Sequence, residues 1–281
     1  MRIAVIGSRG MFGSELLRLL NSTDIECQGF DRQNLDLEQS AESLAEILKD
    51  FDSVVNAVAF TAVDKAETET YNANTVNAIF AGRLAQASKI ARARFVHIST
   101  DYVFEGSSAT PYKVDDATYP QTAYGKSKAL GEQLVIESGA DYSILRTAWL
   151  YGANGRCFPK VMAELLRKNG NVSVVSDQMG QPTWTRDLAE IVLEVLQLPE
   201  MPKIVHATAS GKTSWAEFAK EVAQSIGLSP DLVKEISSAE FPTPAKRPAW
   251  SVLDNSSDVL TPIGDWRERW QEAAPEVLRG I

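Results

Sequence analysis

Near its N-terminus the chain reads Arg2-Ile3-Ala4-Val5-Ile6-Gly7-Ser8-Arg9-Gly10-Met11-Phe12-Gly13. A short apolar run leads directly into a G-x-x-G-x-x-G turn, and a helical pattern of apolar residues follows. Gly7 and Gly10 would let the backbone turn tightly and approach a pyrophosphate, while Gly13 would let the helix pack close to the strand. The free N–H groups at the start of that helix would bind the phosphates. This segment therefore predicts a strand, a phosphate-binding turn and a helix.

The same alternation of strand and helix patterns continues through the first half of the chain. Short β-branched runs are separated by longer stretches with helical periodicity. Repeated units of this kind predict a parallel sheet with helices on both faces, a doubly wound α/β fold of the Rossmann type. We expect strands at residues 2–6, 25–30, 53–56, 95–99 and 142–146, and helices at residues 12–20, 41–49, 72–93 and 123–138.

The pattern changes after about residue 150. We expect residues 1–150, joined by about 184–207, to form a dinucleotide-binding domain. Residues from about 151–183 and 208–281 would form a smaller C-terminal lobe that binds the substrate and closes over the sheet. The elements expected in this half are helices at residues 158–168, 187–198, 214–226 and 265–278, and strands at residues 172–175 and 203–207.

The composition argues against several classes of protein. The 281 residues carry a formal net charge of −9, whereas a general nucleic-acid binder needs a basic face. Cys27 and Cys157 are the only cysteines and there are two His, so we expect neither a disulfide framework nor a metal site. No apolar run is long enough for a signal-peptide core or a transmembrane helix. We therefore expect a cytoplasmic protein that binds neither nucleic acid nor membrane.

An acidic and a basic residue follow the second expected strand. Asp31 lies where a carboxylate accepts hydrogen bonds from the adenosine ribose of a dinucleotide. Arg32 beside it could instead bind a 2′-phosphate. Both NADH and NADPH are therefore candidate cofactors, and we expect the protein to use both.

A tyrosine and a lysine open the helix expected at residues 123–138. Tyr124 and Lys128 form Y-x-x-x-K, so they share one face of the helix. An ordinary tyrosine has a pKa of about 10, and a nearby ammonium and oxidised nicotinamide would lower it and make the phenol a usable acid and base. Thr100 follows an apolar strand, so its hydroxyl would reach the ligand-binding edge of the sheet. Together with the glycine turn, these residues predict an NAD(P)-dependent reductase.

Five further segments resemble one enzyme family. Residues 56–67 are similar to its N-A-A-A-x-T-x-V-D-x-A-E segment, and residues 99–104 read S-T-D-Y-V-F. Residues 146–152, 177–183 and 247–254 are similar to R-T-x-W-V-Y-G, D-Q-x-G-x-P-T and R-P-x-x-S-x-L-D. On these segments the chain resembles the extended short-chain dehydrogenase/reductase family, and within it the dTDP-4-dehydrorhamnose reductases, essentially from end to end.

The resemblance implies the last step of dTDP-L-rhamnose synthesis. Hydride from NADPH or NADH would reach C4 of a 4-keto-6-deoxy sugar bound to dTDP, and Tyr124 would protonate the new alkoxide. Lys128 would lower the Tyr124 pKa and hold the nicotinamide ribose. Thr100 and Asp101 would contact the sugar, and Trp149 would form part of the substrate pocket.

Other residues take their roles from the same resemblance. Arg247 lies in the expected closing lobe, and its forked guanidinium suits the diphosphate of the substrate. The family's usual His is absent at the position of Phe60, which changes the cofactor pocket but no proton-transfer group. The residues expected to line the cofactor are Met11, Phe12, Asp36, Leu37, Val58, Ala59 and Phe60.

Two other functions remain open on the sequence. A non-catalytic regulatory subunit of this fold would bind a nicotinamide cofactor and a partner enzyme, but it would not need Thr100, Tyr124 and Lys128. A nucleotide-sugar epimerase or dehydratase would share the scaffold, and Asp101 beside Thr100 could act as the base of a dehydratase. The sequence does not determine the oligomeric state, and a homodimer is one option.

Overall fold

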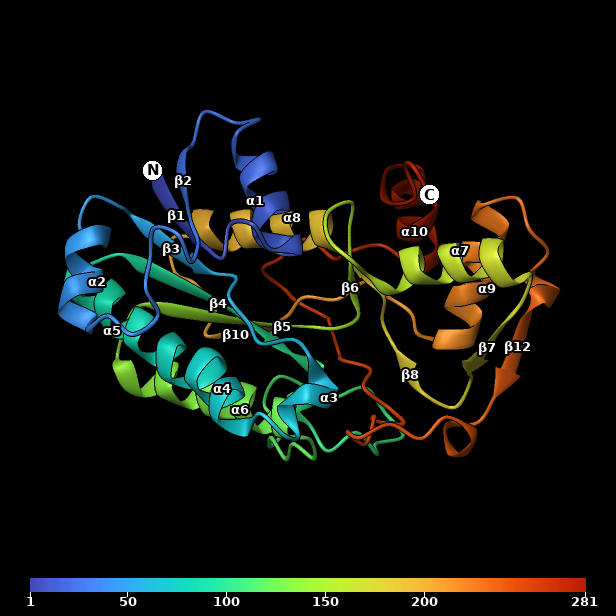
Figure 1. The fold of residues 1–281 in the computed structure, drawn as a ribbon. Helices are drawn as coiled ribbons and strands as arrows, with labels where there is room; N and C mark the ends of the chain where they lie inside the picture. The colour runs from blue at the N-terminus through green and yellow to red at the C-terminus, as the bar shows by residue number, and fades with distance from the viewer.

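The computed structural model describes residues 1–281 and is built around a six-stranded sheet (Figure 1). All its strands run parallel, in the order β10-β5-β4-β3-β1-β2. The chain order reverses between β1 and β3, and ligands bind such sheets at the carboxyl ends of the strands beside that point. The predicted doubly wound α/β fold is confirmed. The strands are β1 (Arg2–Ile6), β2 (Glu26–Phe30), β3 (Ser53–Asn56), β4 (Arg94–Thr100), β5 (Tyr142–Thr147) and β10 (Ile204–His206).

Alternate residues of each strand bury their side chains on opposite faces of the sheet. Ile3 and Val5 pack into a cluster that includes residues of α1 and α8, whereas Ala4 and Ile6 pack with α2 and α5. In Figure 1, α1 and α8 lie above the sheet, and α2, α5 and α6 lie below it. Because both faces are covered, the inner strands are apolar along most of their length. These helices are α1 (Met11–Leu20), α2 (Ala41–Leu48), α5 (Phe80–Ala91), α6 (Ala123–Ser138) and α8 (Thr185–Gln197).

The helix expected at residues 72–93 is divided into three parts. Helix α4 (Thr70–Asn74) continues into a π-helical turn, Thr75–Ile79, and then into α5. Asn77 lies in the π turn with its side chain fully buried. It accepts a hydrogen bond from Phe60 N at 2.7 Å and donates to Ser127 Oγ at 2.8 Å. Periodicity does not reveal such a turn, and π turns are frequent at functional sites.

A second group of elements lies to the right of the sheet in Figure 1. Helix α7 (Phe158–Asn169) packs against α9 (Trp215–Ser225), and β7 (Val172–Val175) pairs in parallel with β12 (Val233–Ile236). The sequence pattern does not predict β12, because its two middle residues are polar and exposed. Helix α10 (Trp266–Val277) packs its buried tryptophans into the core cluster shared by α1 and α8.

Several short segments complete the structure. All the other helices and strands expected from the sequence begin and end within two residues of those observed. No helix in the structure is both long and apolar enough to cross a membrane. The short segments are α3 (Val63–Ala66), β6 (Leu150–Tyr151), β8 (Met179–Gly180), β9 (Thr183–Trp184), β11 (Thr213–Ser214) and the 3-10 turns Asp101–Val103, Pro230–Leu232 and Ser238–Glu240.

Candidate active site

The glycine turn after β1 is folded as tightly as its sequence suggests. Gly7 has φ +88°, a conformation that favours glycine, and Gly10 N donates to Gly7 O at 2.9 Å. A Cβ added to Gly13 would lie 2.2 Å from Gly7 O, so only glycine lets α1 start this close to the strand. Gly10 is the N-cap of α1, and no side chain caps the free N–H groups of the first turn. This cradle fits a pyrophosphate.

A cavity of about 440 Å³ adjoins the glycine turn. Met11 and Phe12 do not line it, since their side chains pack against the core, and any contact they make with a cofactor would come from their backbone. Asp36 does not line it either, and its carboxylate accepts a hydrogen bond from Glu38 N at 3.0 Å. The expected cofactor residues that do line the cavity are Gly7, Gly10, Asp31, Arg32, Leu37, Val58, Ala59 and Phe60.

Arg9 also lines the cavity, a role that the glycine motif does not predict. Its Nε lies 2.5 Å from Asp31 Oδ2, and its Nη2 donates to Gln33 Oε1 at 2.8 Å. Asp31 Oδ1 also accepts from Gln33 N at 2.7 Å. Arg9 and the exposed Arg32 thus place two guanidinium groups on the cavity wall that contains Asp31. Carboxylate and guanidinium groups together suit either a ribose diol or a 2′-phosphate.

Tyr124 and Thr100 meet at the carboxyl end of β4. Thr122 caps α6 by accepting from Gly125 N at 3.0 Å, which places Tyr124 in the first turn of the helix. The Thr100 hydroxyl donates to Asp101 Oδ1 at 2.8 Å. Burial raises the pKa of Tyr124 to about 12, with Thr100 lowering it and Asp101 raising it further. The phenol is therefore protonated at neutral pH, which is the form that can donate a proton.

Lys128 is almost completely buried one helical turn after Tyr124. Its Nζ donates to Ile98 O at 2.6 Å and lies 3.2 Å from His97 Nε2. Burial lowers the pKa of Lys128 to about 8, while Glu132 raises it. Desolvation of the phenolate is the largest effect on the pKa of Tyr124, and it acts against the lowering expected from a nearby ammonium and an oxidised nicotinamide.

A buried ion pair holds α6 against the sheet. Arg146 of β5 donates to both carboxylate oxygens of Glu132, with Nε–Oε1 at 3.0 Å and Nη2–Oε2 at 2.8 Å. Ser99 of β4 donates to Glu132 Oε1 at 2.5 Å. Two strands and the helix that carries Tyr124 and Lys128 are therefore tied together at one carboxylate.

Asp101 is a buried carboxylate beside Thr100. Burial raises its pKa to about 6, while Ser251 and Thr100 lower it, and no donor lies within hydrogen-bond distance of its Oδ2. A buried carboxylate oxygen without a hydrogen-bond partner destabilises the folded state unless a ligand donates a hydrogen bond to it. Asp101 is thus suited to accept a hydrogen bond from a hydroxyl of the substrate.

Trp149 lies between the two groups of elements with a strained backbone. Its φ is +45°, and its ring stacks on Trp215 at 3.5 Å between ring centroids. A Cβ on Gly180 would lie 2.4 Å from the Trp149 ring, so the glycine is needed for this packing. A non-glycine residue in this conformation is uncommon and is often functional.

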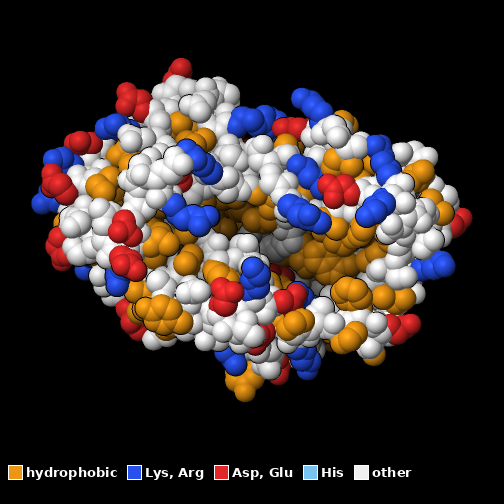
Figure 2. Space-filling model, viewed as in Figure 1, with side chains coloured by type: hydrophobic (Ala, Val, Ile, Leu, Met, Phe, Trp, Pro, Cys, Tyr) orange, Lys and Arg blue, Asp and Glu red, His pale blue; other side chains and the backbone are white.

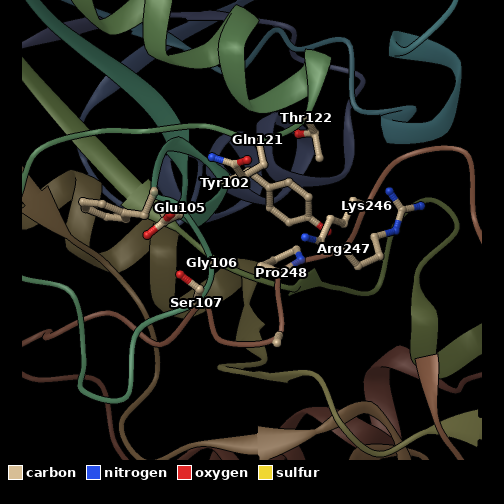
Figure 3. Close-up of a pocket in the computed structure, with 11 residues that line it drawn as sticks. Tyr102, Glu105, Gly106, Ser107, Gln121, Thr122, Lys246, Arg247 and Pro248 are labelled. Atoms are coloured by element: carbon tan, nitrogen blue, oxygen red, sulfur yellow. The ribbon is translucent and has the colours of Figure 1, made fainter. Parts of the chain in front are cut away.

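Arg247 lines a second cavity of about 180 Å³. Figure 3 shows Tyr102 between Gln121 and Thr122 on one side and Lys246, Arg247 and Pro248 on the other. Since this is one cationic wall of a polar cavity, it suits an anionic ligand.

The Arg247 guanidinium forms an ion pair with Asp64, which is distant in the sequence. Its Nη2 donates to Asp64 Oδ2 at 2.7 Å, whereas its Nη1 is buried and has no partner. Figure 2 shows a hollow between the two groups of elements, with hydrophobic atoms inside it and Lys and Arg around it. The net negative charge of the chain therefore coexists with a locally basic opening.

The whole chain matches a known family. The family model described as the RmlD substrate binding domain matches residues 1–280. The chain belongs to this family. The sequence motifs predicted a resemblance to the dTDP-4-dehydrorhamnose reductases, and this prediction is confirmed.

Relatives of this RmlD-family chain cover it almost completely. A probable dTDP-4,6-dihydroxy-2-methyloxan-3-one 4-ketoreductase of Streptomyces antibioticus is 41% identical, over 99% of this chain and 96% of the relative. The crystal structure of a dTDP-4-dehydrorhamnose reductase from Clostridium acetobutylicum is 37% identical with a TM-score of 0.90, over 97% of this chain and 98% of that one. A dTDP-4-dehydrorhamnose reductase from Bacillus anthracis in complex with NADP has a TM-score of 0.92 and 32% identity, with the same coverage.

Several polar residues of the RmlD-family site escape sequence reasoning. Arg9 occupies a variable position of the glycine motif, and Lys246 is only one of many lysines. His97 and Asn77 lie inside apolar strand and helix patterns. The one available signal is a polar side chain at a position where the pattern predicts burial.

Proposed function

We propose that the chain is an NAD(P)H-dependent reductase that converts the C4 carbonyl of dTDP-4-dehydro-L-rhamnose to the alcohol of dTDP-L-rhamnose. The observation that carries this proposal is that Tyr124 and the Thr100 hydroxyl meet at the carboxyl end of β4, with Lys128 buried one helical turn further along α6. The glycine cradle lies at the same end of the parallel sheet. Membership of the RmlD family supplies the substrate class.

The residues of the first cavity would hold the cofactor. The backbone of Gly7, Gly10 and the first turn of α1, at Met11, Phe12 and Gly13, would bind the pyrophosphate. Leu37, Val58, Ala59 and Phe60 would form the apolar wall. Lys128, which does not line this cavity, would bond the nicotinamide ribose. When bound, the nicotinamide supplies the hydride. Asp31, Arg9 and Arg32 would bind the adenosine ribose or its 2′-phosphate, so both NADH and NADPH serve.

Proton donation falls to Tyr124. An alkoxide is more basic than a phenolate, so a phenol with a pKa of about 12 still gives up its proton to the reduced sugar oxygen. Thr100 orients the sugar end of the substrate, and Asp101 accepts from one of its hydroxyls. In its protonated form, Lys128 stabilises the phenolate that remains after proton transfer.

Substrate binding would fall to the C-terminal elements. Residues from about 151–183 and 208–281 would form the substrate-binding lobe, and residues 1–150 with about 184–207 the dinucleotide-binding domain. Arg247, with one guanidinium nitrogen left unpartnered, would bind the diphosphate. Trp149 would form the wall of the sugar pocket.

The compartment and assembly are part of the proposal. Cys27 and Cys157 are both unpaired, which suits a reducing compartment, so we place the enzyme in the cytoplasm. We propose that it acts without a nucleic-acid or membrane partner. Light scattering on the purified protein would distinguish a monomer from a homodimer.

The test of function is consumption of NADPH or NADH with dTDP-4-dehydro-L-rhamnose as substrate. Wild type should be active, and Tyr124→Phe should lose at least ~100-fold in kcat, the scale for removal of a general acid. Tyr71→Phe is the matched control, because Tyr71 is 81% exposed and the substitution should change nothing. Equal rates for wild type and Tyr124→Phe would contradict the role of Tyr124.

A second arm of the same assay tests the sugar. The Streptomyces antibioticus relative is named for a different dTDP-linked keto sugar, so that substrate should be run in parallel. A kcat/KM higher for the alternative sugar would reassign the substrate and keep the reductase chemistry. Absence of turnover with either sugar would favour the regulatory-subunit alternative.

A further inference from the structure

His97 is a fully buried residue of β4 that lies between β3 and α6. Its Nδ1 is 3.1 Å from Asn56 Nδ2, and its Nε2 is 3.2 Å from Lys128 Nζ. A neutral imidazole carries one ring proton, so one nitrogen donates and the other accepts. The position of that proton decides what His97 offers to Lys128.

The orientation of the Asn56 amide determines the tautomer. Val58 N donates to Asn56 Oδ1 at 3.1 Å, and a backbone N–H can only donate, so this end of the amide must be the oxygen. The NH₂ end therefore faces His97 and donates to Nδ1. Burial lowers the pKa of His97 well below its usual value, and the charge of Lys128 acts in the same direction, so the ring is neutral. Its single proton is left on Nε2, directed at Lys128 Nζ.

We propose that His97 is a positioning residue whose Nε2–H donates to Lys128 and favours the neutral amine over the ammonium. An ammonium has three donors and no lone pair, so its N–H groups could not accept the Nε2–H of His97 and two donors would face each other. The amine can accept from His97 and still donate to Ile98 O at 2.6 Å. His97 would in this way keep the proton of Lys128 easy to release and recover during turnover, and only this last step depends on the proposed function.

Other groups around Lys128 also influence its protonation. Burial is the largest cause of its lowered pKa, and Glu132 opposes it. The helices that pack on α6 contribute the buried but uncharged Asn77. The titratable and charged side chains on the elements around Lys128 that are at least partly buried include Tyr124 and Glu132 on α6, His97 on β4, Asp101 and Tyr102 on the 3-10 turn, and Arg146 on β5.

The tautomer can be measured directly by NMR with ¹⁵N-labelled histidine. The chain has two His, and the second is an internal control. His206 Nδ1 lies 3.0 Å from Asp254 O, which only accepts, so the neutral His206 ring carries its proton on Nδ1. We expect the His97 ring to be protonated on Nε2 and the His206 ring on Nδ1. The spectrum of His206→Gln would show which signals belong to His97. A His97 ring protonated on Nδ1 would overturn the proposal, whether or not the protein reduces any sugar.

Asn56→Asp should invert the arrangement. The carboxylate still accepts from Val58 N but offers His97 only acceptors, so the ring proton moves to Nδ1 and Nε2 accepts from the Lys128 ammonium. We expect the His97 ¹⁵N signals to exchange roles and the alkaline limb of kcat to move up by about one pH unit. Asn56→Asp in a His97→Phe background is the matched control, because it keeps the new charge but removes the ring. An equal shift of the alkaline limb with and without His97 would show that the His97 ring does not control the protonation of Lys128.

Discussion

The buried ion pair between Glu132 and Arg146 gives the sharpest test of how the site is held. The Glu132 and Arg146 side chains are only 5% and 4% exposed, and three N–H···O bonds join them. Glu132→Gln keeps the shape but leaves the guanidinium buried without a counter-charge, which costs about 3–5 kcal/mol. For a domain of this size that loss lowers the melting temperature by roughly 6–20 °C.

Thermal denaturation followed by circular dichroism measures this effect. Glu46→Gln is the matched control, since Glu46 pairs with Lys49 at the surface with side chains 73% and 56% exposed, and such an exposed pair adds little to stability. Replacing Glu132 and Arg146 together by Met should restore most of the lost stability, because no charge then remains buried. A Glu132→Gln melting temperature within about 2 °C of wild type would refute the reasoning.

Three further predictions concern ligands. Gly13→Ala places a Cβ 2.2 Å from Gly7 O and should raise the Kd for NADPH at least ~10-fold by calorimetry, whereas Gly10→Ala, with its nearest atom at 3.2 Å, should do less. Arg247→Ala should raise the KM for the dTDP sugar by about 10-fold or more and change kcat far less; an unchanged KM would remove Arg247 from the site. Wild type should use NADH and NADPH within ~100-fold of each other, and Arg9→Ala should raise the KM for NADPH more than that for NADH, by about 10-fold, because Arg9 lies beside Asp31. The same KM increase for both cofactors would exclude recognition of the 2′-phosphate by Arg9.

The regular elements could be predicted because their signals are local. Strand β3 and helix α6 have the bounds that periodicity gives, since each residue's burial follows from its neighbours along the chain. Strand β12 could not be predicted, because it pairs only with β7 and has a polar middle. The π turn at Thr75–Ile79 was also hidden, since its buried Asn77 bonds to Phe60 and Ser127, which are distant in sequence.

By itself, the sequence determined the phosphate cradle and the shared face of Tyr124 and Lys128. Both depend on fixed spacing along the backbone, which needs no knowledge of distant residues. Tertiary structure alone decided which groups surround them: it brought His97 to Lys128 and Asp64 to Arg247. It also decided that the Tyr124 pKa rises, because the cost of removing a charge from water depends on everything packed around it.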